Sequence, residues 1–190
     1  MWTVDAFRFA FVAACALAVF FLRGDKWLLA GMALTVMADA CLLLLGWHTT
    51  GVAVFVFAHI SYICRASGSI RGLKWYPLAF IMPLVLLLCK QPMLLVLSAL
   101  YAQSLLWAAA ASIRAWRAQK QPVWRWRLAA LGMVLFIGCD ICVALYNLES
   151  AGLQNAALSK AAGQLIWFFY APSQLCLALS AWRGRRSNKA

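Results

Sequence analysis

The chain has few acidic residues, few histidines and few charges of any kind. Five of its 190 residues are Asp or Glu, and 12% are charged against 66% that are hydrophobic. A water-soluble domain of this size needs a polar exterior, and this composition cannot supply one. The shortage of charge therefore excludes a soluble globular protein and indicates a polytopic helical membrane protein.

Other shortages disfavour particular kinds of membrane protein. The only histidines are His48 and His59, whereas a zinc amidase of the ceramidase type usually needs three around its metal. Lys160 precedes the last apolar run, whose middle has no lysine for a retinal chromophore. Cys139 and Cys142 form a CxxC motif without a second pair, so we interpret the seven cysteines as packing residues. We expect no metal and no cofactor, and zinc hydrolysis stays a minor alternative.

Seven apolar runs approach the length of about 20 residues that a helix needs to cross a bilayer. They lie near residues 6–22, 27–46, 50–65, 74–90, 92–113, 126–147 and 161–182. We therefore predict an all-α fold, a transmembrane bundle of about seven helices that forms a single domain over residues 1–190.

The basic residues predict how this bundle is oriented. With the N-terminus outside, all of the 17 Lys and Arg residues except Arg8, Lys90 and Lys160 lie on the cytoplasmic side, as the positive-inside rule requires. The C-terminus is then cytoplasmic. Arg23 and Lys26 follow the first apolar run, so we expect that run to be a retained helix and not a cleaved signal. We predict a multi-pass protein of the plasma membrane, which in a bacterium is the inner membrane.

The same distribution explains the net charge of +12. Most of this charge reflects topology, and the remainder attracts anionic lipid head groups. We therefore expect membrane lipids as partners and no nucleic acid.

Two of the five acidic residues lie inside apolar runs, in matching sequence frames. Residues 31–41 and 132–142 share Gly, Met, Leu, Asp and Cys at the same offsets, which places Asp39 and Asp140 within predicted helices. Carboxylates at membrane depth are costly and often functional. The alternative is that both aspartates only bond neighbouring hydroxyls and help the helices to pack.

Helix geometry places further polar side chains at the same depth. At 1.5 Å per residue, Asp39 and His59 lie about 10 and 13 Å below the outer surface on adjacent antiparallel helices, so they can meet. Asp140 and Tyr170 lie at a similar depth by the same arithmetic. An acid beside an imidazole is a pair suited to proton transfer.

Helical spacing adds polar neighbours to this layer. Tyr62 follows His59 by three residues, and Trp167, Tyr170 and Gln174 recur at three and four. Tyr101 lies on the fifth predicted helix, three residues after a serine. Each of these side chains also has a simpler interpretation, as a hydrogen-bonding contact between helices.

Several segments resemble one known family in the same order. Residues 38–44 and 51–62 are similar to the Gly-Asp-x-x-Leu and Gly-x-x-x-Phe-x-x-x-His-x-x-Tyr signature of the YhhN-like lysoplasmalogenase family of membrane hydrolases. Tyr101 with Trp107, residues 136–140 and residues 170–174 resemble its later motifs. Members of that family usually carry eight helices, whereas this chain has room for seven.

The resemblance implies hydrolysis of the vinyl-ether bond of lysoplasmalogens, which are lysophospholipids, to a fatty aldehyde and a glycerophospho-base. This chemistry needs one protonated carboxyl and one carboxylate, as in glycoside hydrolysis. Asp39 and Asp140 would share one proton as the acid/base pair, and His59 would orient one of them. Four further side chains would bind substrate or water: Tyr62, Tyr101, Tyr170 and Gln174.

A second class of function stays open. A proton-coupled transporter of small molecules or lipids also requires acidic residues within the membrane, and Asp39 and Asp140 would serve it equally well. The matching frames at 31–41 and 132–142 are similar to the parallel repeats of small carriers.

Overall fold

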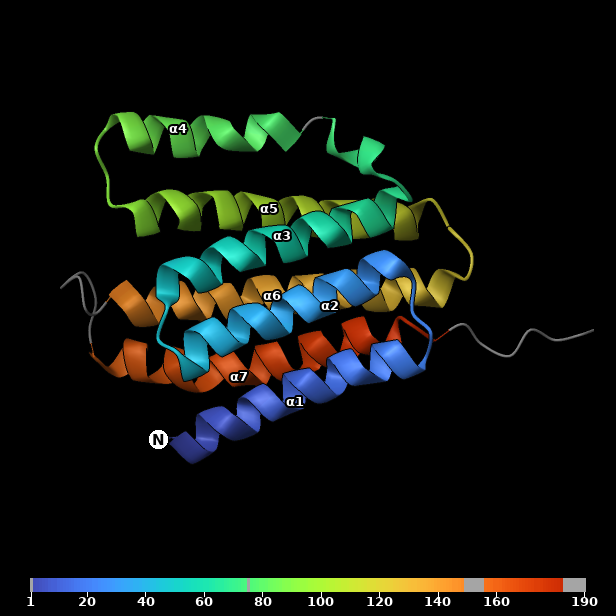
Figure 1. Ribbon diagram of the computed structural model, residues 1–190, viewed down its shortest axis with the longest axis horizontal. Coiled ribbons are helices and arrows are strands. Elements are labelled where there is room, and N and C mark those ends of the chain that lie inside the picture. The colour runs from blue at the N-terminus through green and yellow to red at the C-terminus, as the bar shows by residue number, and fades with distance from the viewer. Residues whose placement is uncertain (1, 75, 149–155, 183–190) are drawn as a thin grey trace, which may run out of the picture.

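The computed structural model describes residues 2–74, 76–148 and 156–182, and in these ranges it contains helices and no β-strand (Figure 1). Seven α-helices run side by side. They are α1 (Trp2–Phe21), α2 (Lys26–Asp39), α3 (His48–Ser67), α4 (Ile81–Leu88), α5 (Met93–Arg117), α6 (Val123–Leu148) and α7 (Ala156–Leu179). A π-helical segment, Ala40–Leu44, continues α2, and two 3-10 helices, Ile70–Leu73 and Tyr76–Phe80, precede α4.

Five helical segments of the described chain are long and apolar enough to cross a membrane: Val4–Phe21, Lys26–Leu44, His48–Ser67, Met93–Arg117 and Val123–Asn147. They agree with five of the seven predicted runs. The α7 helix has 24 residues, but Lys160, Gln164 and Gln174 make it less apolar. The chain is therefore a multi-pass membrane protein by the length and composition of its helices.

The run predicted at residues 74–90 differs from the expectation. In place of one spanning helix, it contains the 3-10 helix Tyr76–Phe80 and the eight-residue helix α4. Pro77 and Pro83 lie within it, and each proline removes a backbone donor and disturbs a regular helix. Its composition is that of a membrane span, but its α-helical part has only eight residues; the segment still carries the chain from the end of α3 to the start of α5 at the opposite end of the bundle. Figure 1 shows α4 at the edge of the bundle, beside α5.

The bundle core forms where helices approach closely. The α3 helix packs between α2 and α5, while α6 packs along α7. A Cβ atom at Gly31 would come within 2.5 Å of the Tyr62 ring, and one at Gly132 within 3.0 Å of Leu177. Small residues at such contacts allow membrane helices to pack without voids. The glycines that begin the two matching frames thus mark the α2–α3 and α6–α7 contacts.

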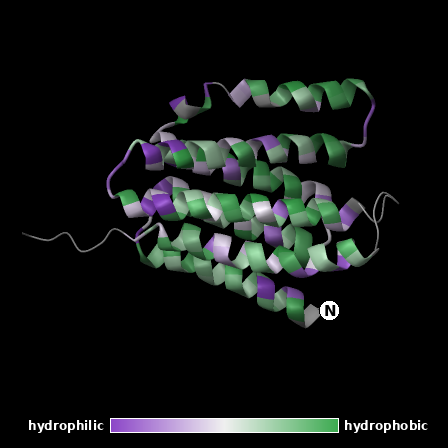
Figure 2. Ribbon diagram, turned by 180° about the vertical axis from the view of Figure 1, so that it is seen from behind, coloured by the Kyte–Doolittle hydropathy of each residue, from purple (hydrophilic) through white to green (hydrophobic). Residues whose placement is uncertain are grey.

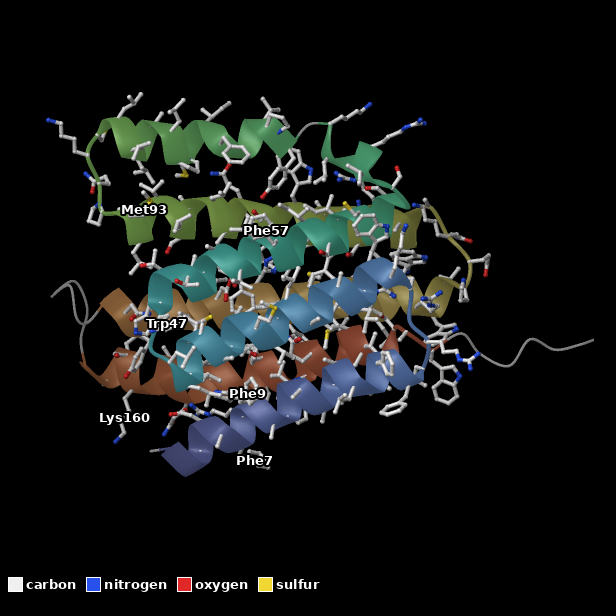
Figure 3. All side chains as sticks on the ribbon, in the orientation of Figure 1. Phe7, Phe9, Trp47, Phe57, Met93 and Lys160 are labelled. Atoms are coloured by element: carbon white, nitrogen blue, oxygen red, sulfur yellow. The ribbon has the colours of Figure 1, made fainter. Side chains whose placement is uncertain are left out.

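Polar residues are concentrated near the helix ends and in the loops, and apolar residues cover most of the helix lengths (Figure 2). At one end, Arg65 of α3 donates a hydrogen bond from Nε to Oδ2 of Asp25 at 2.9 Å and from Nη1 to Oγ of Ser180 at 2.8 Å. Arg125 donates from Nε to the Ser180 carbonyl at 2.8 Å. This network joins α3 and the start of α6 to the residues that flank α2 and α7. Lys160 lies at the opposite end (Figure 3).

Candidate active site

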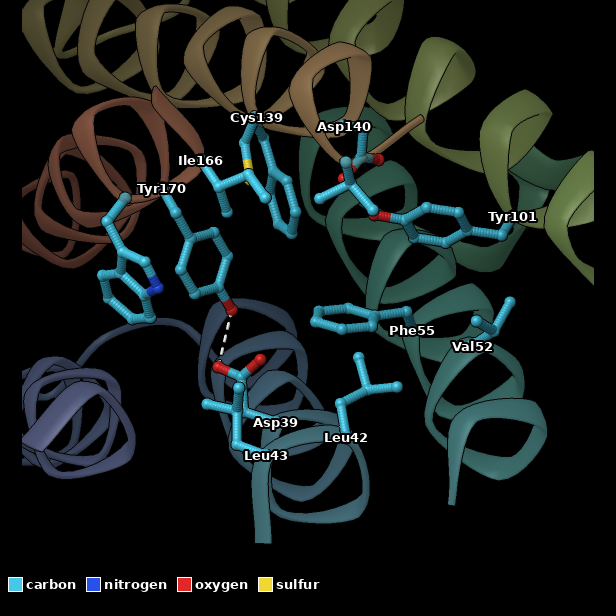
Figure 4. A pocket seen from close by; sticks show the side chains of 13 residues that line it. Asp39, Leu42, Leu43, Val52, Phe55, Tyr101, Cys139, Asp140, Ile166 and Tyr170 are labelled. Carbon is cyan, nitrogen blue, oxygen red and sulfur yellow. Dashed lines mark hydrogen bonds between the residues drawn. The ribbon is translucent and has the colours of Figure 1, made fainter. Parts of the chain in front are cut away.

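A partly open cavity of about 200 Å³ lies among α2, α3, α5, α6 and α7. Figure 4 shows that its polar groups face one another across an apolar space. Two carboxyls and two phenols line it, from Asp39, Asp140, Tyr101 and Tyr170. The remaining wall is apolar apart from the thiol of Cys139 and the indole nitrogen of Trp167; it also includes Leu42, Leu43, Val52, Phe55, Phe136, Val143 and Ile166.

Asp39 lies at the last position of α2 and is 4% exposed. Tyr170 of α7 donates its hydroxyl to Oδ2 of Asp39 at 2.6 Å (Figure 4). A short hydrogen bond to a carboxyl is among the stronger ones in proteins. The phenol therefore ties α7 to α2 across one wall of the cavity and fixes the direction of the carboxyl.

Directly after Asp39, the α-helix changes to the wider turn of a π-helix over Ala40–Leu44. The Leu45 amide donates to the Ala40 carbonyl at 3.1 Å, five residues back. π-helical turns are rare and occur frequently at functional sites. Here the wide turn carries Leu42 and Leu43, which line the cavity. Sequence reasoning missed this feature, since residues 40–44 contain neither proline nor glycine.

Asp140 lies on α6, across the cavity from Asp39 (Figure 4). Its Oδ2 atom is buried and has no hydrogen-bond partner among the described residues. The Tyr101 ring extends from α5 so that its hydroxyl approaches this carboxyl. A buried polar atom without a partner is costly, which makes this carboxyl a candidate functional group.

His59 is placed differently from the sequence expectation. Its Nδ1 atom hydrogen-bonds the Phe55 carbonyl at 2.8 Å, and since a carbonyl only accepts, Nδ1 carries the hydrogen. The imidazole packs on Tyr101 and Phe136, with ring centroids 5.3 and 5.2 Å away. The predicted pairing with Asp39 is therefore absent, because Asp39 bonds Tyr170 instead. The bond to its own helix directs the ring of His59 along α3 toward α5 and α6.

Tyr62 and Gln174 also lie behind the cavity wall. The Tyr62 hydroxyl shares a hydrogen bond with Oγ1 of Thr35 at 3.3 Å. Gln174 is fully buried and donates from Nε2 to Oγ of Ser173 at 3.4 Å. The remaining polar atoms, Nε2 of His59 and Oε1 of Gln174, are buried without a hydrogen-bond partner in the part of the chain that the structure describes. These side chains support the cavity but do not line it.

The sequence analysis assigned no role to several lining residues, although some of them lie in the segments 51–62 and 136–140 that resemble the family motifs. Phe55 and Phe136 both line the cavity, and their rings pack edge to face with centroids 5.8 Å apart. Phe55 lies four residues before His59, so helical periodicity alone could have indicated it. All seven cysteines are free thiols, and the described residues contain no cluster of three or more His, Cys, Asp or Glu side chains.

The comparisons with known proteins identify the family. The comparisons with curated proteins and with solved structures gave no significant match. The model of the YhhN family matches residues 4–181, which include Asp39, Asp140 and every other residue of the cavity. This match agrees with the family resemblance that the sequence motifs indicate. The chain therefore belongs to the YhhN family.

Proposed function

We propose that the protein is a membrane-embedded hydrolase that cleaves the vinyl-ether bond of lysoplasmalogens. The products are a fatty aldehyde and a glycerophospho-base. The observation that carries this proposal is the pair of carboxyls, Asp39 and Asp140, on opposite walls of one apolar cavity. Membership of the YhhN family and the motif resemblance to lysoplasmalogenases support it.

Vinyl-ether hydrolysis requires a proton on carbon before water can attack. Protonation of the carbon beta to oxygen converts the double bond into an oxocarbenium ion. A water molecule then adds to the cationic carbon, and the resulting hemiacetal separates into aldehyde and alcohol. The site therefore needs one group that donates a proton and one that stabilises positive charge.

The surroundings of the two aspartates suit them to different roles. Asp140 lines the apolar wall, and no donor among the described residues reaches its Oδ2 atom to stabilise a negative charge there, so we assign it the proton that is transferred to carbon. Asp39 accepts the Tyr170 hydroxyl bond, so we assign it the carboxylate that faces the cation. The proton released by the attacking water returns to Asp140, which completes the cycle. The aspartate roles are borrowed by analogy from paired carboxylates in glycoside hydrolysis.

The other predicted site residues fall into two groups. Tyr101 and Tyr170 line the cavity, so we assign them contacts with substrate or water. His59, Tyr62 and Gln174 lie behind the wall, so we assign them positioning roles. His59 in particular packs on the Tyr101 ring at 5.3 Å, and this contact holds the phenol near Asp140.

The test measures aldehyde release by purified protein in detergent, from lysoplasmalogen and from its saturated-ether analogue. Only the vinyl ether should yield aldehyde, because the saturated ether has no double bond to protonate. Asp39→Asn and Asp140→Asn should each lower the rate by about 10² to 10⁴-fold, the usual contribution of a general acid or base. Cys142→Ala, a buried change on α6 outside the cavity, should retain the wild-type rate.

Two outcomes would contradict the proposal. One is that purified protein releases no aldehyde from the vinyl ether. The other is that an aspartate variant keeps more than roughly a tenth of the rate, which would make that residue structural only.

A second candidate, proton-coupled transport, is favoured by the matching frames at residues 31–41 and 132–142. Their glycines lie at two helix contacts, as in a repeated unit. A transporter would leave the vinyl-ether lipid intact, and the lipid would accumulate inside proteoliposomes that contain the protein. Hydrolysis would instead consume it with formation of aldehyde.

A further inference from the structure

The first helix brings a basic side chain to the edge of the cavity. The α1 helix packs against α7 and against the π-helical segment Ala40–Leu44, and both of these contribute to the cavity wall. Arg8 of α1 places its Cζ atom 5.0 Å from the ring centroid of Trp167, which lines the cavity. A guanidinium stacked on an indole is held by cation–π attraction, and this contact orients it before any ligand binds.

The position of Arg8 relative to the carboxyls can be estimated along α7. Trp167 precedes Tyr170 by three residues, or about 4.5 Å of helix rise, and their ring centroids are 5.3 Å apart. Tyr170 in turn bonds Asp39. The guanidinium carbon is therefore no more than about 10 Å from the centre of the Tyr170 ring, toward the end of the bundle at which α7 begins.

This distance fits a lysophospholipid. Its vinyl-ether oxygen and its phosphorus are joined by five single bonds of about 1.5 Å, which separate them by about 6 Å, and a guanidinium carbon lies roughly 4 Å from a phosphorus that it binds through two oxygens. A substrate whose vinyl ether lies between Asp39 and Asp140 would thus place its phosphate beside Arg8.

The charges point to the same arrangement. Among the side chains that line the cavity, the ionisable acids are Asp39 and Asp140 and there is no Lys or Arg, so a phosphate inside would meet only like charge. Arg8 bonds Asp5 through Nη1 at 3.3 Å, and its guanidinium has four further N–H donors. A planar guanidinium matches phosphate oxygens in a two-point contact.

We infer that Arg8, held on Trp167, binds the phosphate of the lysolipid head group and selects phosphorylated substrates over neutral vinyl-ether glycerols. This inference rests on the proposed function. Arg8 is then a specificity-determining residue, while the carboxyls carry out the reaction.

The test compares two vinyl-ether substrates: lysoplasmalogen and the alkenylglycerol that lacks a phosphate. Wild-type protein should prefer lysoplasmalogen. Arg8→Gln should lower kcat/KM for lysoplasmalogen by about 10- to 150-fold, the range of a lost hydrogen bond to a charged group. The neutral substrate should be cleaved at comparable rates by both proteins, and Arg8→Lys should recover part of the preference.

Lys160→Gln is the matched control, because Lys160 is an exposed cation on α7 at the same end of the bundle and does not line the cavity (Figure 3). It should leave the preference for lysoplasmalogen unchanged. Equal loss of both activities in Arg8→Gln would overturn the inference, since Arg8 would then only hold α1 in place or bind bulk phospholipid.

Binding of the saturated-ether compounds separates this inference from the proposed function. Wild-type protein should bind the saturated-ether lysophospholipid more tightly than the saturated-ether glycerol, and Arg8→Gln should remove most of that difference. If wild-type protein binds the two equally, the inference on Arg8 is wrong. If this preference holds but no aldehyde forms from any vinyl ether, the hydrolase proposal fails and the phosphate site stands.

Discussion

The bond between Tyr170 and Asp39 allows a test with a change of one atom. Tyr170→Phe removes the hydroxyl that Asp39 accepts at 2.6 Å and keeps the ring. The ring still packs on Phe136 and Trp167, whose centroids each lie 5.3 Å away. The substitution therefore tests the hydrogen bond with little change in packing.

The size of the effect follows from the nature of the bond. A hydrogen bond to a charged group contributes about 1.5–3 kcal/mol, which corresponds to a factor of about 10 to 150. If Asp39 must be a directed carboxylate when the cation forms, the loss should appear in kcat. We therefore expect Tyr170→Phe to lower the rate of aldehyde release by about 10- to 150-fold.

Tyr76→Phe is the control for this experiment. The Tyr76 hydroxyl is also buried and hydrogen-bonds Oγ of Ser104 at 2.6 Å, but neither residue lines the cavity. Its removal should lower thermal stability in detergent without lowering the rate. A Tyr170→Phe protein with the wild-type rate, or an equal loss in Tyr76→Phe, would refute the assignment of Asp39 as a carboxylate directed by Tyr170.

Three further predictions concern stability and topology. Gly31→Leu should destabilise the fold by about 1–3 kcal/mol, since even a Cβ atom there would lie 2.5 Å from the Tyr62 ring. Thermal unfolding in detergent measures this loss of stability. An unchanged unfolding midpoint would show that α2 and α3 separate at little cost. Arg65→Ala should cost about 1.5–3 kcal/mol in the same assay, because it removes the bonds of a buried guanidinium to Asp25 and Ser180, although Arg125 still donates to both; an unchanged midpoint would count against the network. Reporter fusions should place the N-terminus outside and the C-terminus in the cytoplasm, and a cytoplasmic N-terminus would reverse the assigned orientation.

Most of the helices could be predicted from the sequence because a membrane imposes a simple requirement. A spanning segment must satisfy its own backbone hydrogen bonds, so it is an apolar helix of predictable length. The run at 74–90 meets the requirement for composition, but Pro77 lies in a 3-10 helix and the α-helix that follows has only eight residues, with Pro83 in its first turn. Hydropathy alone therefore did not predict the length of the α-helix in this segment.

The site could be predicted only in part. Asp39 and Asp140 are evident in the sequence because carboxyls inside apolar runs are rare. Depth arithmetic placed Tyr170 at their level, and the structure brings all three to one cavity. The same arithmetic put His59 beside Asp39, but the imidazole faces Tyr101. Residue counts determine height along a helix axis, while the direction of a side chain around that axis depends on packing.

The sequence by itself determined the class of protein, the length of most helices and the presence of two buried acids, since these depend on composition and on short-range periodicity. Only the tertiary structure decided which side chains pair: Tyr170 with Asp39, and Arg8 with Trp167. It also decided that the chain widens into a π-helix at residues 40–44. The physical reason is that partners far apart in sequence are selected by helix rotation and close packing, which no local pattern encodes.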